Sequence, residues 1–268
     1  MKLAFTTLVC PEWSLAQIAD AAVRLGYHGV ELRCDAAQAH GVEVWSEEDA
    51  ILAASELLQS LHLTPCCLAT GVQLRDDRHN EALPARAKLA AALGCPGLRV
   101  LVGALEPWQH LRDIAQDIAL RLREAAELAA ELGVEVWLET HDSAARVADA
   151  AALIHQAGHP NLGLLYDNLH PQRMGEDLAT SFAHLQGRLR HVHLHDGLKR
   201  EDLVVVRPLG EGDLPMSETF RRLRQSGYDG FLCGEWFHDQ YGPTPDEALE
   251  RYAADINELA IRHGVTLG

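Results

Sequence analysis

Four residues with metal-binding side chains each end an apolar, strand-like run in the second half of the chain. They are Glu139 in VEVWLETH, Asp167 in LGLLYDNLH, His193 in RHVHLHD and Glu235 in GFLCGEW. The intervals of 28, 26 and 42 residues (167−139, 193−167, 235−193) each leave room for a strand, a loop and a helix. Side chains so far apart in sequence converge only if parallel strands lie side by side. The spacing therefore predicts a cation at the carboxyl end of a parallel sheet.

The types of these four side chains indicate which cation would bind. Two glutamates, one aspartate and one imidazole supply mostly oxygen ligands, which suit Mn²⁺, Mg²⁺ or Co²⁺ and tolerate Zn²⁺. Each residue alone has an ordinary alternative, since Asp167 can simply cap the next segment and a lone histidine is usually a satisfied core residue. However, His191, His193 and His195 share one strand face by alternation, and burying polar groups is costly unless they are paired. The joint pattern is therefore stronger evidence than any single member.

Alternating strands and helices are expected to position these residues. Amphipathic stretches lie between the strands, and the clearest is 110–132, which Gly133 ends. Ser14 and Gln17 form a capping-box pattern at the start of the first helix. Apolar runs predict eight strands, at 2–8, 28–33, 62–69, 98–103, 134–139, 162–167, 190–195 and 230–235.

Such alternation predicts an α/β protein with parallel strands and helical crossovers. Eight units in 268 residues favour a single (β/α)8 TIM barrel that spans residues 1–268. An open doubly wound sheet is the alternative, but no glycine-rich dinucleotide fingerprint follows the first strand.

The composition excludes some classes of partner. A net charge of −16 disfavours binding to nucleic acid or to an anionic membrane, because both require lysine and arginine to replace counterions. The first residues read as a strand rather than a signal peptide, so we expect a cytoplasmic protein without membrane segments. The six cysteines form no C-x-x-C pair, which predicts reduced, buried thiols. Cys233 is the thiol placed closest to the predicted site.

The chain resembles the xylose isomerase-like TIM-barrel superfamily along essentially its whole length. This superfamily contains sugar isomerases, ketose 3-epimerases, hydroxypyruvate isomerases, and inosose dehydratases and isomerases. Its motifs are specific to the superfamily but poor at naming the substrate. The matching segments are Val30-Glu31-Leu32-Arg33, Leu138-Glu139-Thr140-His141, Tyr166-Asp167-Asn168-Leu169-His170, Val192-His193-Leu194-His195-Asp196, Leu209-Gly210-Glu211-Gly212-Asp213 and Gly234-Glu235.

The resemblance implies one divalent metal ion (Mn, Mg, Co or Zn) with Glu139, Asp167, His193 and Glu235 as its ligands. Isomerising a sugar next to its carbonyl requires removal of a carbon-bound proton, and a divalent cation can hold the negative charge that develops. In the epimerases of the superfamily the two glutamate ligands move the proton, which assigns Glu139 and Glu235 as the acid and base. His195 replaces the lysine that the superfamily usually has at that position.

The substrate is expected to be a small sugar or polyol. The resemblance assigns it contacts with His170 and Arg207, and we add His141, two residues after Glu139. Aromatic faces pack against sugars, so Trp108 and Trp236 are candidates for the pocket wall, although they can equally pack loops onto the rim. No phosphate loop is present, and Arg99, Lys199 and Arg207 are only scattered candidates for a phosphate contact. A homodimer is an open option, since barrels of this kind often pair.

Glu31, in the second predicted strand, is interpreted as a group that supports a ligand or pairs with Arg33. Three other functions remain as alternatives. An inosose-type dehydratase would use the same scaffold and the same proton abstraction. An apurinic endonuclease of the endonuclease IV type would need histidines on the third and fourth strands, which end in CLATG and VLVG. A barrel that only binds a ligand is the third alternative.

Overall fold

Eight parallel strands close into a barrel, which confirms the predicted TIM-barrel fold. The computed structural model describes residues 1–201 and 203–268, apart from the side chain of residue 80. Around the barrel the strand order is β1-β10-β7-β6-β5-β4-β3-β2. The strands are β1 (Lys2–Thr6), β2 (Gly29–Arg33), β3 (Thr64–Gln73), β4 (Gly97–Leu101), β5 (Glu135–Glu139), β6 (Leu162–Asp167), β7 (Leu189–His193) and β10 (Phe231–Gly234).

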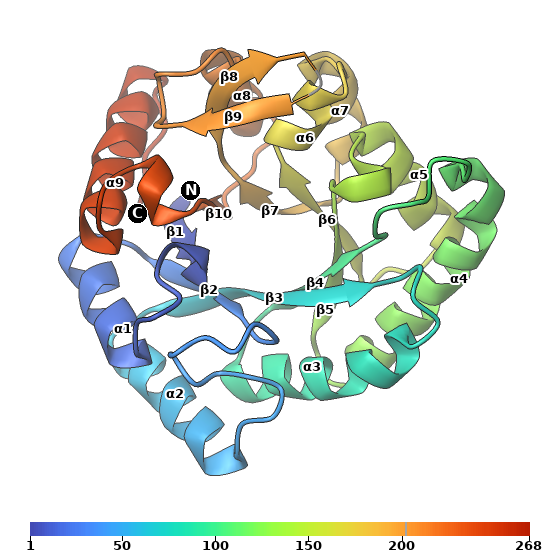
Figure 1. Cartoon of the computed structure of the whole chain (residues 1–268), viewed down its shortest axis with the longest axis horizontal. Helices are drawn as coiled ribbons and strands as arrows, with labels where there is room; N and C mark the ends of the chain where they lie inside the picture. The colour runs from blue at the N-terminus through green and yellow to red at the C-terminus, as the bar shows by residue number, and fades with distance from the viewer. Residues whose placement is uncertain (202) are drawn as a thin grey trace.

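Helices form a ring around the barrel, as Figure 1 shows. The Ser14 capping box is confirmed, with the Ser14 backbone N–H donating to Gln17 Oε1 at 2.9 Å. The helix expected at 110–132 runs from Leu111 to Ala130 and buries the apolar face that its periodicity predicts. The helices are α1 (Leu15–Arg24), α2 (Glu48–Ser60), α3 (His79–Leu93), α4 (Leu111–Ala130), α5 (Val147–Ala157), α6 (Leu169–Arg173), α7 (Leu178–Leu185), α8 (Met216–Gln225) and α9 (Pro245–Arg262), with 3₁₀ turns η1 (Thr7–Val9), η2 (Asp142–Ala144) and η3 (His238–Gln240).

A tryptophan fills the barrel below the carboxyl ends of the strands. Trp137 lies on β5 two residues before Glu139, so both side chains are on the same strand face. Its indole stacks on the His191 ring, with 5.7 Å between ring centroids. A Cβ atom on Gly97 would overlap this indole, and one on Gly163 would lie 3.0 Å from it. Gly97 on β4 therefore makes room for the Trp137 ring, whereas Gly163 on β6 makes room chiefly for the Arg190 side chain.

A two-stranded antiparallel hairpin follows β7, and the sequence analysis did not predict it. It consists of β8 (Asp196–Arg200) and β9 (Leu203–Arg207), and β7 ends at His193 rather than at residue 195. The Asp196 carboxylate accepts hydrogen bonds from the backbone N–H groups of Gly210 (2.8 Å) and Gly212 (3.1 Å). These hydrogen bonds hold the loop that follows β9 against the start of β8, near the rim of the barrel.

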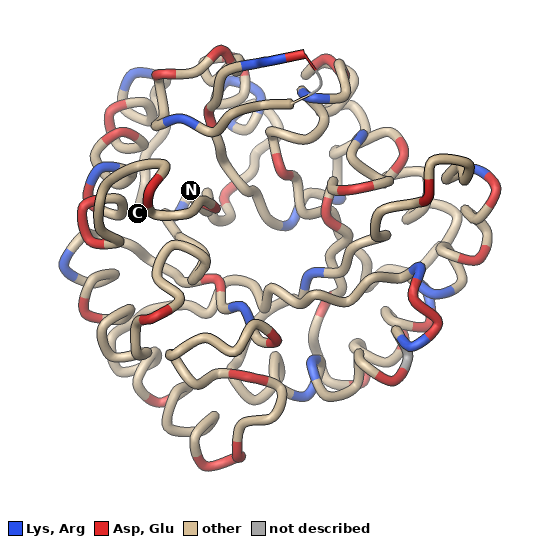
Figure 2. The backbone as a smooth tube through the Cα atoms, viewed as in Figure 1, with Lys and Arg blue, Asp and Glu red and all other residues tan. Residues whose placement is uncertain are grey.

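The surface carries acidic and basic residues interspersed around the outer ring (Figure 2). None of the helices in residues 1–201 and 203–268 is long and apolar enough to cross a membrane. All six cysteines are free and buried, as predicted.

Candidate metal centre and active site

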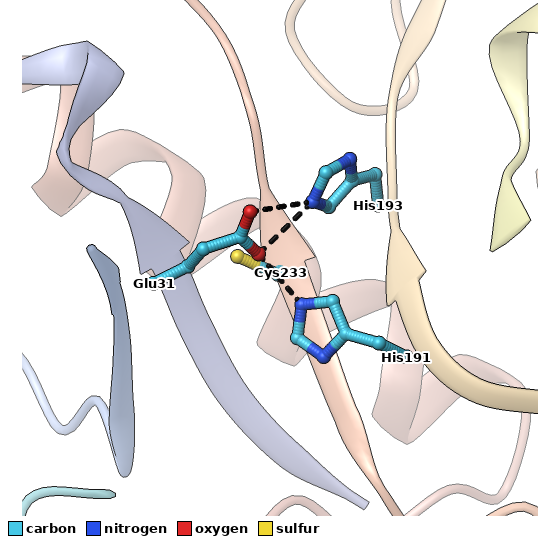
Figure 3. A group of neighbouring side chains, drawn as sticks. All are labelled: Glu31, His191, His193 and Cys233. Atoms are coloured by element: carbon cyan, nitrogen blue, oxygen red, sulfur yellow. Dashed lines mark hydrogen bonds and ion pairs between the residues drawn. The ribbon is translucent and has the colours of Figure 1, made fainter. Parts of the chain in front are cut away.

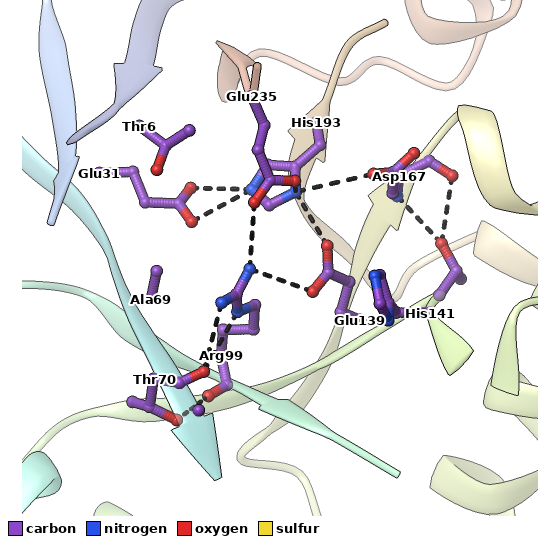
Figure 4. A network of polar contacts seen from close by, with 12 residues as sticks. Thr6, Glu31, Ala69, Thr70, Arg99, Glu139, His141, Asp167, His193 and Glu235 are labelled. Atoms are coloured by element: carbon purple, nitrogen blue, oxygen red, sulfur yellow. Dashed lines mark hydrogen bonds and ion pairs between the residues drawn. The ribbon is translucent and has the colours of Figure 1, made fainter. Parts of the chain in front are cut away.

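The structure brings together the four side chains that the sequence spacing singled out. One ligand atom from each of Glu139, Asp167, His193 and Glu235 lies within 4.8 Å of the others. Glu139, Asp167 and His193 are the last residues of β5, β6 and β7, and Glu235 directly follows β10. The first three are buried, and the Glu235 side chain is 16% exposed. The group therefore lies at the carboxyl end of the barrel (Figure 4), where barrels of this type place their chemistry.

His193 occupies the middle of this group. Its Nδ1 atom lies 2.9 Å from Glu139 Oε1 and 2.9 Å from Glu235 Oε2. Burial alone would lower the pKa of His193, but the carboxylates around it, chiefly those of Glu235 and Glu31, raise it well above its usual range. A proton on His193 Nδ1 thus lies between one carboxylate oxygen of Glu139 and one of Glu235, where a metal cation would also lie.

The donor set fits a divalent metal ion. The Nε2 atom of His193 faces the Glu31 carboxylate at 3.0 and 3.1 Å, so an Nε2–H bond to Glu31 leaves the Nδ1 lone pair free for a cation. Such an ion would replace the Nδ1 proton. Glu31 is thus a support for His193, as one of the two interpretations predicted, and its ion pairs are with His191 and His193 rather than with Arg33.

A buried arginine contacts both glutamates of the group. Arg99 Nη1 lies 3.3 Å from Glu139 Oε2 and 3.3 Å from Glu235 Oε1. Its Nε and Nη2 atoms donate to the backbone carbonyl of Thr70 at 3.4 and 3.3 Å, which holds the guanidinium in place. Burial would raise the pKa of Glu235, but His193 and Arg99 lower it well below its usual range. The sequence analysis treated Arg99 only as a scattered phosphate candidate.

The charges of the group also match a divalent ion. Glu139, Asp167 and Glu235 carry three negative charges when ionised, and the Arg99 guanidinium carries one positive charge. With His193 neutral, two negative charges remain, and one divalent cation would neutralise them. Buried carboxylates are costly unless they are paired or bind a metal, so this balance supports a metal rather than an empty acidic cluster.

Two further imidazoles lie near the Asp167 carboxylate, and a third packs against one of them. His195 Nε2 lies 3.0 Å and His170 Nε2 lies 3.8 Å from Asp167 Oδ2. The His141 ring packs edge-on against the His170 ring, with 4.2 Å between centroids, and its Nδ1 atom lies 2.9 Å from Asp142 Oδ1. His141 and His170, both predicted to bind substrate, therefore border the four ligands. His195, which stands in place of the usual lysine, contacts a predicted ligand directly.

Arg207 and Trp108 are not brought into contact with this group. Arg207 is exposed at the end of β9, and its Nη1 donates to the carbonyl of the neighbouring Val206 at 3.2 Å. The hairpin, which was not predicted, carries this arginine along the rim. The Trp108 side chain is 74% exposed in the loop before α4. Their contacts with substrate therefore stay predictions.

Trp236 also points away from the four ligands. It is 2% exposed, and its indole stacks on the rings of Tyr252 and Tyr241, with centroid distances of 4.2 and 4.8 Å. Neighbouring residues along an extended chain point to opposite sides. Because Glu235 faces the barrel interior, Trp236 packs on the outer side, against Tyr252 of α9, which favours a packing role over the pocket wall.

Replacing Gly234 with alanine is expected to destabilise the barrel by about 1–3 kcal/mol, because the new Cβ atom would overlap the Trp236 ring. The measurement is the free energy of unfolding in urea. Gly71→Ala is the matched control within β3, since its Cβ atom would meet only ordinary contacts at 3.5 Å or more. An equal loss of stability in both variants would contradict the role assigned to Gly234.

Comparison with known proteins identifies the family. A family model described as the xylose isomerase-like TIM barrel matches residues 19–259. The chain belongs to this family. Among xylose isomerase-like barrels, the hydroxypyruvate isomerase of Escherichia coli K12 is 24% identical over 233 residues, which cover 81% of this chain and 85% of that enzyme. Fructoselysine 3-epimerase of Escherichia coli O157:H7 is 29% identical over 150 residues, 53% of this chain and 54% of that enzyme.

This chain spans about half the length of several of the curated xylose isomerase-like relatives that it matches. Solved structures share the fold over nearly the whole chain. The IOLI protein, crystallised with a bound zinc atom, has a TM-score of 0.86 at 18% identity and covers 98% of this chain and 99% of its own. The probable 3-DHS dehydratase AsbF of Bacillus anthracis shares the fold with a TM-score of 0.80 at 22% identity and covers 96% of this chain and 99% of its own.

Proposed function

We propose that the chain is a divalent-metal-dependent isomerase or epimerase of a sugar, a ketose or a related polyhydroxy carbonyl compound. The observation that carries the proposal is the convergence of Glu139, Asp167, His193 and Glu235 within 4.8 Å at the carboxyl end of the barrel. The relatives named hydroxypyruvate isomerase and fructoselysine 3-epimerase support this class of reaction.

The two glutamates are proposed to move the proton. They approach His193 Nδ1 at the same distance of 2.9 Å and come from β5 and from the end of β10. One carboxylate removes the proton next to the substrate carbonyl, and the other returns a proton to the product. Arg99 Nη1 lies 3.3 Å from both carboxylates and forms an ion pair with each of them. A divalent ion bound by the four ligands would stabilise the negative charge that develops on the substrate oxygens.

Residues around the ligands are proposed to position the substrate. His141 is about one-third exposed (35%) and lies beside His170. Both rings can hydrogen-bond to substrate hydroxyl groups, because each imidazole offers a donor or an acceptor at either nitrogen. Below them, the Trp137 indole stacks on the His191 ring inside the barrel.

A screen in deuterium oxide is the experiment that tests the function. Ketoses, inososes and hydroxypyruvate are incubated with the protein and with Mn²⁺, Mg²⁺, Co²⁺ or Zn²⁺, and products are analysed by NMR and mass spectrometry. We expect at least one substrate to gain deuterium next to its carbonyl without loss of water, and a chelator to stop the reaction. If no compound exchanges with any metal, or if exchange persists in the chelator, the proposal is wrong.

A dehydratase on the same scaffold is the second candidate. The His141 and His170 rings lie together beside Asp167, where an imidazolium can donate a proton to a departing hydroxyl group. A 3-DHS dehydratase is among the structures that share the fold. The same screen separates the two reactions, because a dehydratase product is lighter than its substrate by one water molecule.

The remaining alternatives have less support. An endonuclease of the endonuclease IV type would need histidines from β3 and β4, and neither strand contains one. The charge of −16 also disfavours a nucleic acid partner.

We therefore propose a small sugar or polyol as the partner. A barrel that binds this ligand without turnover is distinguished by the screen, and the predicted homodimer is a matter for solution measurement.

A further inference from the structure

A second group of buried ligand-type side chains lies directly below the candidate metal centre. Its members are Glu31 on β2, His191 and His193 on β7 and Cys233 on β10, and one ligand atom from each lies within 4.8 Å of the others. All four residues are at most 1% exposed. Figure 3 shows both imidazoles directed at the Glu31 carboxylate, with the Cys233 sulfur beside it. We call these four residues the lower group.

The lower group contains a buried carboxylate without a lysine or arginine partner. Glu31 Oε2 lies 2.8 Å from His191 Nε2 and 3.0 Å from His193 Nε2. Within residues 1–201 and 203–268, no lysine or arginine makes an ion pair with Glu31. Once an ion at the candidate metal centre has replaced the His193 Nδ1 proton, Glu31 is a carboxylate buried among neutral imidazoles, which is costly. A bound cation would supply the missing positive charge.

We propose that the lower group is a second metal site, which binds a zinc-type cation through Glu31, His191, His193 and Cys233. Thiolate and imidazole ligands together select Zn²⁺ or Co²⁺ over Mg²⁺ and Mn²⁺. Four protein ligands with no open position are typical of a structural zinc site. Zinc bonds of about 2.0–2.3 Å in a tetrahedron separate the ligand atoms by about 3.4 Å. The nitrogen–oxygen distances of 2.8 and 3.0 Å therefore need to open by only about half an ångström.

Binding at the lower group changes the protonation of two ligands. The Cys233 thiol loses its proton to become a thiolate, and His193 Nε2 gives up the proton that it shares with Glu31, so two protons leave to solvent for each ion bound at the lower group. His191 stays neutral with its proton on Nδ1. When an ion also occupies the upper group, His193 carries no ring proton and would bridge the two ions as an imidazolate. His193 then contacts the lower ion through Nε2 and presents Nδ1 to the candidate metal centre. The two sites share one imidazole but differ in the rest of their ligands, since the upper group supplies three carboxylates and the lower group supplies a thiol.

Titration of the metal-free, full-length protein with Co²⁺ tests this proposal without reference to catalysis. We expect two equivalents of cobalt after removal of unbound metal, together with the near-ultraviolet thiolate-to-cobalt charge-transfer band. Mn²⁺, which avoids thiolates, should bind at only one equivalent. In Cys233→Ser the charge-transfer band should disappear and the cobalt content should fall from two equivalents to one.

The matched control is Cys66→Ala, because Cys66 packs beside Cys233 but does not belong to the lower group. It should keep both the band and the second equivalent. Glu235→Gln should keep the band even if the upper site is weakened, which separates failure of this proposal from failure of the proposed function. If Cys233→Ser does not fold, Cys233→Ala and displacement of the cobalt band by Zn²⁺ replace it. One equivalent without a band in the wild-type protein, or an unchanged band in the folded Cys233 variants, would overturn the proposal.

Discussion

Replacing Glu139 or Glu235 with glutamine is expected to stop the exchange of solvent deuterium into the carbon next to the substrate carbonyl while the barrel still folds. Glutamine keeps the size of the side chain but removes the carboxylate that takes or returns the proton. The contribution of a general acid or base is about 10²–10⁴-fold, so we expect the exchange rate at saturating metal to fall by at least about 100-fold. The measurement is the initial rate of deuterium incorporation by NMR, with the metal content of each variant determined alongside.

Glu127→Gln is the matched control for these two variants. Glu127 is a half-exposed carboxylate on α4 that pairs with Arg123 on the same helix, 3.0 Å away. Its loss should leave the exchange rate unchanged, because a surface ion pair contributes little. Full exchange by either Glu139→Gln or Glu235→Gln, with the metal bound, would refute the assignment of the acid and base.

Removing the positive charge of Arg99 is expected to have the largest effect on stability. In Arg99→Leu the buried carboxylates of Glu139 and Glu235 lose the guanidinium that lies 3.3 Å from each of them. Breaking a buried ion pair by removing one partner costs about 3–5 kcal/mol. We expect this loss in the free energy of unfolding when a chelator is present. A saturating divalent cation should recover part of the loss, because it binds the same carboxylates in the folded state only.

Urea unfolding with and without the divalent cation measures both effects. Arg190→Leu is the control, because Arg190 pairs with Glu135 of the same barrel at 2.8 Å, with both side chains about one-third exposed. We expect a loss of no more than about 1 kcal/mol in that variant and no dependence on the cation. If Arg99→Leu is as stable as the wild-type protein in the chelator, Arg99 does not neutralise the glutamates.

The positions of the four predicted ligands could be inferred from sequence because they follow from the regular alternation of the chain. Each of the strand-like runs that carry them ends on a carboxylate or an imidazole. Parallel packing places the carboxyl ends of the strands at the same end of the barrel, so these side chains lie together. The pairing of Glu31 with His193 could not be inferred, because 162 residues separate them and no local pattern names the partner. Arg99 carried a signal that was available, namely a single arginine inside an otherwise apolar strand. No local pattern identified its two partners, which are Glu139 at the end of the neighbouring strand β5 and Glu235 after β10.

Two other features were missed for different reasons. The hairpin of β8 and β9 follows β7 after only two residues, and its short strands resemble a polar loop when read without their partners. For Trp236 the information was present, since alternation places it opposite Glu235. The stacking of Trp236 on Tyr252 and Tyr241 favours the packing role, which was one of the two alternatives that the sequence left open.

The pairing of β1 with β10 joins the first strand of the chain to the last strand of the barrel. Glu235 directly follows β10, so the fourth ligand reaches the other three only after that strand has docked. On a ribosome, the set of four ligands would stay incomplete until Glu235 had been synthesised. A bound cation is therefore expected to lower the rate of unfolding of the complete barrel and to leave its rate of folding nearly unchanged.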